Sequence, residues 1–142
     1  MSFFNLFVHH RKSSLAGYLR RDARVNAVVL SGGKKNDMVH FLAGHCHTKC
    51  QVVIFDLART NDQGVQAPCV SLGENILDNN VINYKYETVQ VDFITPPKVV
   101  FFANNPPDMS LLSMDRWQVV ELPSYPDKSK TIEKMKTFNI NF

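Results

Sequence analysis

The stretch KVVFFANNPPDMSLLSMDRW, residues 98–117, decides the fold. Its first part, Lys98–Ala103, is an apolar run of the kind that forms a strand buried on both faces of a sheet. The run ends at Asn104, and α/β proteins use such strand ends to place a ligand-binding group at the carboxyl edge of a sheet. Asn104 is therefore a candidate for ligand contact, although Asn also starts simple turns. Arg116, near the end of the stretch, is a candidate for phosphate contact.

Segments on either side of this stretch alternate between strand and helix patterns. Three further apolar runs have the length of buried strands: 25–30, 52–55 and 117–122. Helical spacing and capping residues predict helices over 12–24, over 36–43 with an end at Gly44, and over 74–79. Apolar strands separated by helices favour an α/β fold with a mostly parallel sheet that is covered on both faces.

Other segments complete the expected organisation. Apolar residues alternate with polar ones over Val89–Phe93, so residues 84–94 are expected to form a hairpin or an edge strand. Residues 58–73 contain two glycines and a proline and are expected to form a loop. We expect one domain over 1–123 and a C-terminal tail over 124–142, which is rich in Lys.

Composition limits the class of protein without selecting a function. The chain has 142 residues, of which 44% are hydrophobic, enough for the core of one domain. Its net charge of +3 permits a nucleic-acid partner without requiring one. The apolar segment Phe3–Val8 is too short to span a bilayer, so no membrane partner is expected. Cys46, Cys50 and Cys69 lack disulfide-framework spacing and are expected to be reduced thiols of a cytosolic or nuclear protein.

The run Val52–Phe55 is followed by Asp56, which is the pattern of a Walker B strand. A carboxylate at the end of a buried strand can hold Mg²⁺ beside nucleotide phosphates. Many buried strands end in Asp, so this pattern alone leaves an ordinary strand end as the alternative.

Lys12 and Ser13 stand where the Lys-Ser pair of a P-loop, G-x-x-x-x-G-K-[ST], would precede a helix. The two glycines of that motif fall on Leu6 and Arg11 instead. Glycines are needed there because backbone N–H groups must approach the phosphates closely, in conformations that side chains obstruct. We therefore expect nucleotide binding to be impaired or lost, although Lys12 and Ser13 are present.

A small cluster of potential metal ligands contains His45, Cys46, His47 and Cys50. Adjacent ligands in a tight loop rarely close a tetrahedral zinc site, and a second pair at zinc-finger spacing is missing. A solvated loop is therefore the expectation.

Lys85 and Tyr86 are candidates for contact with nucleic acid. A Lys at the tip of a hairpin can meet a phosphate, and a neighbouring aromatic ring can support base stacking. The alternative is an ordinary exposed pair on an edge strand.

Taken in order, these segments resemble one protein family. Lys12-Ser13 before a helix, SGGK after a strand, VVIFDLAR, YKYE and PPKVVFFANNPPDMSLLSMDRW are similar to the superfamily 3 helicase half of the replication-associated (Rep) proteins of circular single-stranded DNA viruses. Within that group the chain resembles the Reps of plant nanoviruses and their alphasatellites. The resemblance covers about residues 12–122. It implies a P-loop NTPase core of the AAA+-like kind, with a mostly parallel sheet flanked by helices and an inserted β-hairpin.

The resemblance also implies a nucleotide site. Lys12 and Ser13 match the P-loop pair that contacts phosphate and Mg²⁺, and Asp56 matches the Walker B acid that holds the metal. Asn104 matches the sensor that orients the attacking water. Arg116 resembles the arginine finger that is presented to the nucleotide of a neighbouring subunit. ATP and Mg²⁺ are thus the implied cofactors.

Partners are implied in the same way. Lys85 and Tyr86 match a hairpin motif that engages single-stranded DNA in a central channel. A finger that reaches a neighbour implies active sites between the subunits of a ring, which is expected to be a hexamer. Its other subunits would be copies of this chain or a full-length Rep, in the nucleus of the host cell.

Three departures from the family pattern bear on activity. The P-loop glycines are absent, Leu57 follows Asp56 so that a second acid is missing, and these 142 residues do not include the nicking domain of full-length Reps. The chain thus resembles a Rep truncated at the P-loop. The expected function is that of an ATP-dependent DNA helicase domain in rolling-circle replication, with weak or no hydrolysis. The alternative is a non-catalytic module that binds DNA, oligomerises and co-assembles with a full-length Rep.

Overall fold

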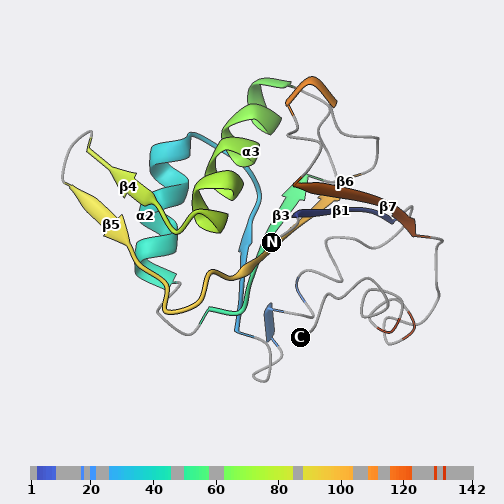
Figure 1. Ribbon diagram of the computed structural model, residues 1–142, viewed down its shortest axis with the longest axis horizontal. Coiled ribbons are helices and arrows are strands. Elements are labelled where there is room, and N and C mark those ends of the chain that lie inside the picture. The colour runs from blue at the N-terminus through green and yellow to red at the C-terminus, as the bar shows by residue number, and fades with distance from the viewer. Residues whose placement is uncertain are drawn as a thin grey trace.

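A five-stranded parallel sheet forms the centre of this protein, whose structure is a computed structural model (Figure 1). The structure describes residues 3–8, 17, 20–21, 26–45, 50–57, 63–84, 88–103, 109–111, 116–122, 130 and 133. The sheet has the order β2-β3-β6-β1-β7 and every neighbouring pair is parallel. Its strands are β1 (Phe3–Val8), β2 (Ala27–Leu30), β3 (Val52–Leu57), β6 (Lys98–Ala103) and β7 (Trp117–Leu122).

Strand β1 occupies the interior of the sheet, between β6 and β7. In register, Leu6 lies opposite Phe102 on one side and Val120 on the other. This strand was not predicted from the sequence, where the apolar residues before Lys12 were interpreted only as a segment too short to span a bilayer and as the front of a P-loop. Strands β6 and β7 are confirmed, with the bounds that the apolar runs 98–103 and 117–122 predict.

Helices α2 (Lys35–His45) and α3 (Gln63–Leu77) cover one face of the sheet (Figure 1). Both helices bury apolar side chains against inward-facing residues of β3 and β6, of which Phe55 and Phe101 stack with a centroid distance of 4.6 Å. The opposite face of these two strands is also buried, since Ile54 and Phe102 have no exposed surface. Strands buried on both faces are typical of a parallel sheet, as predicted.

The prediction of a loop over residues 58–73 is wrong for most of that segment. Helix α3 begins at Gln63 and continues through Pro68 to Leu77, and it includes most of the helix predicted over 74–79. Cys69, Leu72 and Ile76 lie on one buried face at helical spacing. Burial of this face outweighs the low helix propensity of the proline and the glycines, since propensity is a weak effect beside tertiary packing.

Strands β4 (Val81–Asn83) and β5 (Val89–Val91) form a separate antiparallel hairpin. It lies against α2, so that the two helices are between the hairpin and the main sheet (Figure 1). The inserted hairpin is thus confirmed, with its first strand earlier than the predicted segment 84–94.

Smaller differences concern the ends of elements. Strand β3 does not stop before Asp56 but includes it and Leu57. Gly44 does not end α2, which continues to His45. Gly17, Arg20 and Arg21 are helical, and the rest of the helix predicted over 12–24 lies outside the described residues.

The short 3₁₀ helix η1 (Met109–Leu111) lies between β6 and β7 in the sequence. In the described part of the chain, none of the helices combines the length and the apolar character needed to cross a membrane. The division into a domain over 1–123 and a tail over 124–142 stays a prediction; Lys130 and Glu133 of that tail are helical and exposed.

Candidate functional site

The carboxyl ends of β1 and β6 form a topological switch point of the sheet. From β1 the chain connects to β2 at one edge, and from β6 it connects past β1 to β7 at the other edge. Ligands of open α/β sheets bind in the crevice at such points, because the two connections diverge there. Ala103 lies opposite Phe7 of β1 and opposite Leu57 of β3. The ends of three strands therefore lie side by side at this edge.

Asp56 lies at this edge of the sheet, one residue before the end of β3. It is half-buried, whereas the other residues of β3 are buried. Alternate residues of a strand point to opposite faces, and Phe55 and Leu57 belong to the core beneath α2 and α3. The carboxylate of Asp56 is therefore on the face of the sheet that α2 and α3 do not cover.

The remaining candidates for nucleotide contact lie outside the described residues. Asn104 follows Ala103, the last residue of β6, and Lys12 and Ser13 follow Val8, the last residue of β1. Each thus comes after a strand that ends at the switch point.

The bounds of β1 bear on whether a phosphate cradle can form before Lys12. Leu6, at the position of the first P-loop glycine, is paired on both sides within the sheet and is not a loop residue. His9, His10 and Arg11 are the three residues between the end of β1 and Lys12. A G-x-x-x-x-G cradle is longer than this connection, which also contains no glycine. The residues present do not fit the phosphate-binding loop that the resemblance implies.

Arg116 lies at the amino ends of the parallel strands, whereas Asp56 lies near their carboxyl ends. It directly precedes Trp117, the first residue of β7, and β7 runs parallel to the other strands. Its Nη2 atom lies 2.9 Å from Oδ1 of Asp78, in an ion pair that links the start of β7 to the residue after α3. One chain therefore does not bring Arg116 and Asp56 together at one site.

Lys85 and Tyr86 fall between β4, which ends at Asn83, and β5, which begins at Val89. They belong to the connection of the hairpin in the sequence, as predicted, and they lie outside the described residues. The residue before them, Tyr84, has 75% of its surface exposed.

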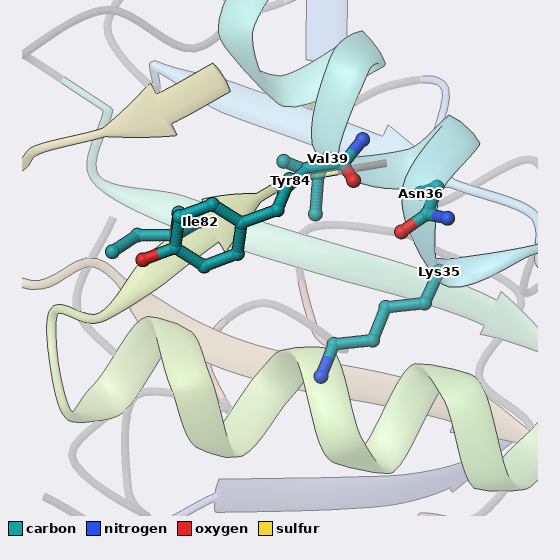
Figure 2. A pocket seen from close by; sticks show the side chains of 6 residues that line it. Lys35, Asn36, Val39, Ile82 and Tyr84 are labelled. Atoms are coloured by element: carbon teal, nitrogen blue, oxygen red, sulfur yellow. The ribbon is translucent and has the colours of Figure 1, made fainter. Parts of the chain in front are cut away.

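A cavity of about 390 Å³ lies between α2 and the first strand of the hairpin (Figure 2). It is lined by Lys35, Asn36, Val39, Ile82, Asn83 and Tyr84. This cavity was not predicted from the sequence, because its two walls come from segments that are far apart in the chain. The nearest local pattern is Ser31-Gly32-Gly33-Lys34, which precedes α2 and whose two glycines have positive φ values of 101° and 126°.

The thiols and the histidine cluster show no sign of a metal site among the described residues, where no group of three potential ligands was found. Cys50 and Cys69 are buried as thiols, and burial raises the pKa of Cys69 to about 11. The ring of His45 stacks on Phe41 at 4.0 Å, and its Nδ1 lies 2.9 Å from the carbonyl oxygen of Phe41. Cys46 and His47 lie outside the described residues.

Comparisons with known proteins show two relatives of similar sequence. No family model matches the chain. It is 30% identical over 110 residues to "Para-Rep C3" of Milk vetch dwarf C3 alphasatellite, a match that covers 77% of the chain and 36% of the relative. It is 32% identical over 92 residues to "Para-Rep C6" of Subterranean clover stunt C6 alphasatellite, covering 64% of the chain and 30% of the relative. The chain thus spans about a third of the length of these relatives. The chain is thus distantly related in sequence to these Rep proteins of alphasatellites.

Proposed function

We propose that this chain is a superfamily 3 helicase-type domain of a viral replication-associated protein, which binds single-stranded DNA, assembles with other copies, and hydrolyses ATP weakly or not at all. The observation that carries the proposal is the strand order β2-β3-β6-β1-β7, with Asp56 beside the switch point. Of the three strands that end at this point, β1 and β6 precede the segments that resemble the P-loop pair and the sensor, and β3 contains the segment that resembles Walker B. The relationship to alphasatellite Rep proteins supports the viral assignment.

The nucleotide side of the proposal concerns ATP and Mg²⁺. In an intact site of this kind, Lys12 and Ser13 would contact phosphate, Asp56 would hold the metal through a carboxylate, and Asn104 would face the γ-phosphate. Parallel crossovers are right-handed, so the connection from β1 to β2 is expected on the face of the sheet where Asp56 lies. The short, glycine-free connection after β1 opposes phosphate binding, and for this reason we propose impaired hydrolysis.

Single-stranded DNA is the proposed ligand of the hairpin connection. Lys85 would contact a phosphate and Tyr86 would support a base or the hairpin itself. The hairpin is anchored independently of the P-loop segment, because it is built on α2 and on the end of α3. Loss of the phosphate cradle therefore leaves the DNA-binding element intact.

Assembly is the third part of the proposal. Arg116 and Asp56 lie at opposite edges of one sheet, so an arginine finger at Arg116 serves only the nucleotide of a neighbouring copy. We propose that the neighbours form a ring, a hexamer in the complete assembly, with this chain or a full-length Rep as the other subunits. The site of action would be the host nucleus.

Two titrations test the proposal. Binding of a fluorescent oligo-dT is measured by anisotropy at several salt concentrations, and binding of a fluorescent ATP analogue is measured separately. We expect DNA binding that Lys85→Ala weakens, with the log–log salt slope reduced in magnitude by about 0.7 for one lost phosphate contact on a single strand. Lys130→Ala is the matched control, since Lys130 is an exposed lysine outside the hairpin. Weak or absent binding of the ATP analogue is expected alongside.

The competing function is an active ATPase, which the position of Asp56 beside the switch point favours. A phosphate-release assay separates the two. ATP turnover that requires Mg²⁺ and is lost in Asp56→Ala would show that the chain is an active ATPase and would contradict the proposed impairment. Absence of DNA binding by the wild-type chain would remove the proposal altogether.

A further inference from the structure

The cavity between α2 and β4 has two chemically different sides. Tyr84 and Ile82 come from the hairpin side, and Lys35 and Asn36 come from the first turn of α2 (Figure 2). Val39, one turn further along α2, adds an apolar wall that is almost fully buried. A volume of about 390 Å³ lies within the range of small-molecule sites, which runs from roughly 300 to 1,000 Å³. The cavity is open to solvent, and both apolar and polar side chains line it.

The aromatic ring of Tyr84 is the most accessible part of this cavity. It is 75% exposed although it lies beside the apolar side chains that line the cavity. An exposed tyrosine face at the rim of an apolar cavity can stack on a planar heteroaromatic ring, in the manner of single-strand binding proteins. The amide of Asn36 lines the same space and can exchange hydrogen bonds with the polar edge of a base, whereas Asn83 is buried.

The ammonium group of Lys35 supplies positive charge at the other end of the cavity. Its side chain extends toward α3 (Figure 2), where Nζ donates a hydrogen bond of 2.8 Å to Oγ of Ser71. This bond holds the charge in place, and an ammonium group carries three donors, so further donors remain for an anion. A phosphate is the anion that would accompany a base.

We propose that this cavity binds one unpaired nucleotide. Its base lies against the ring of Tyr84 and the apolar side chain of Ile82, with its polar edge toward Asn36. Its phosphate lies toward Lys35. The nucleotide is part of a DNA strand held at the hairpin, because Tyr84 directly precedes the hairpin connection. This last step rests on the proposed function, whereas the chemistry of the cavity does not.

The test uses anisotropy with oligo-dT and with an abasic oligonucleotide of the same length. We expect Tyr84→Ala to bind oligo-dT about tenfold more weakly than wild type, as for loss of one stacked base, with an unchanged salt slope because no charge is removed. Tyr84→Phe keeps the ring and should bind like wild type. Phe41→Ala removes another exposed ring, outside the cavity, and should also bind like wild type.

Two further measurements tie the effect to the cavity. Wild type should bind the abasic strand more weakly than oligo-dT, and Tyr84→Ala should bind both equally. Asn36→Ala, on the opposite wall, should weaken binding by about threefold, and its effect should not add to that of Tyr84→Ala because both side chains contact one nucleotide. Free dTMP at millimolar concentration should compete with oligo-dT, because the cavity holds a single nucleotide, and absence of competition would count against the cavity site.

The outcomes distinguish this inference from the proposed function. Binding that depends on Lys85 but is unaffected by Tyr84→Ala and Asn36→Ala overturns the cavity site alone. Binding of dTMP that depends on Tyr84, without any binding of oligo-dT, supports the cavity and overturns the proposed DNA-binding function. Binding of neither ligand overturns both.

Discussion

Asn79 ties the end of α3 to the chain that leaves the hairpin. Its φ of 51° lies in the left-handed region, which Asn tolerates better than most residues. Its amide nitrogen donates to the carbonyl oxygen of Phe93 at 2.9 Å, and its side-chain oxygen accepts from the backbone N–H of Phe93 at 3.0 Å. The side chain of Asn79 therefore links the segment after β5 to the end of α3 through two hydrogen bonds.

Replacement of Asn79 separates the hydrogen bonds from the backbone conformation. Asn79→Gly keeps the left-handed conformation and removes both hydrogen bonds, so we expect a loss of about 2 kcal/mol in the free energy of unfolding. Asn79→Ala adds backbone strain and should lose about 1 kcal/mol more. Urea denaturation followed by circular dichroism measures both. If Asn79→Gly unfolds at the wild-type urea concentration, the two hydrogen bonds do not stabilise the hairpin.

The thiol of Cys69 makes stability depend on pH at alkaline values. Burial raises its pKa from 9.0 to about 11, so the folded state retains a proton that the unfolded state releases. The unfolding free energy is therefore insensitive to this group below pH 9, and it falls as the pH rises from 9 to 11. Urea melts of wild type and Cys69→Ala across this range test the point, because only wild type contains the contribution of Cys69.

Alkylation gives an independent measure of the same thiol. Iodoacetamide reacts with the thiolate, so Cys69 should be labelled slowly in the native protein at pH 8 and rapidly in urea, as followed by mass spectrometry. Equal rates in the two states would show that Cys69 is not buried as a protonated thiol.

At the scale of single elements, strands that are apolar throughout were predictable and α3 was not. Strands β6 and β7 have the bounds that their apolar runs predict, and for β6 the reason is that burial on both faces leaves little choice of structure for such a run. The segment of α3 carries Pro68 and glycines that locally oppose a helix. Its helical signal, the spacing of Cys69, Leu72 and Ile76, becomes decisive only when β6 supplies a surface to cover.

The candidate site was predictable to the same extent as its strands. Asp56 and the strand before Asn104 lie at one edge, as the sequence predicts. Strand β1 was not predicted, and its bounds are what place Leu6 inside the sheet. The ion pair between Arg116 and Asp78 and the cavity beside Tyr84 join distant segments, which local patterns do not reveal.

Gly73 sets how closely α3 approaches β6. A Cβ atom at this position would lie 3.3 Å from side-chain atoms of Phe101 and Val99, whereas a Cβ atom at Gly44 would meet nothing within 4 Å. We expect Gly73→Val to lower the free energy of unfolding by about 1–3 kcal/mol through overpacking. Gly44→Val, the matched control in α2, should change it by about 0.5 kcal/mol or less. Equal urea midpoints for the two variants would mean that α3 moves away from the sheet without cost.

At the scale of the whole molecule, the sheet, the two helices and the hairpin form successive layers (Figure 1). The edge with Asp56 belongs to the sheet, and the connection with Lys85 belongs to the hairpin, on the other side of α2 and α3. The hairpin packs on the helices through the shared core, in which the P-loop segment takes no described part. We therefore expect a chain with an impaired phosphate loop to retain the hairpin.

Substitution of Arg116 tests whether assembly brings the amino ends of the strands in one subunit close to the carboxyl ends of the strands in the next. Its pair with Asp78 is partly exposed, with side-chain exposures of 28% and 58%, so its loss should cost less than about 1 kcal/mol of stability. Arg116→Ala removes both this pair and the group that would reach a neighbouring copy. Asp78→Ala removes the pair and keeps the guanidinium group that would reach the neighbour.

We expect both variants to unfold at nearly the wild-type urea concentration and to differ in assembly. In sedimentation velocity with oligo-dT present, Arg116→Ala should shift toward the monomer, whereas Asp78→Ala should assemble like wild type. This difference would follow from the position of Arg116 at the amino end of β7, from which the proposed finger would reach a nucleotide only in another subunit. Identical sedimentation of the two variants and wild type would show that Arg116 does not contribute to assembly, and would contradict its proposed role as an arginine finger.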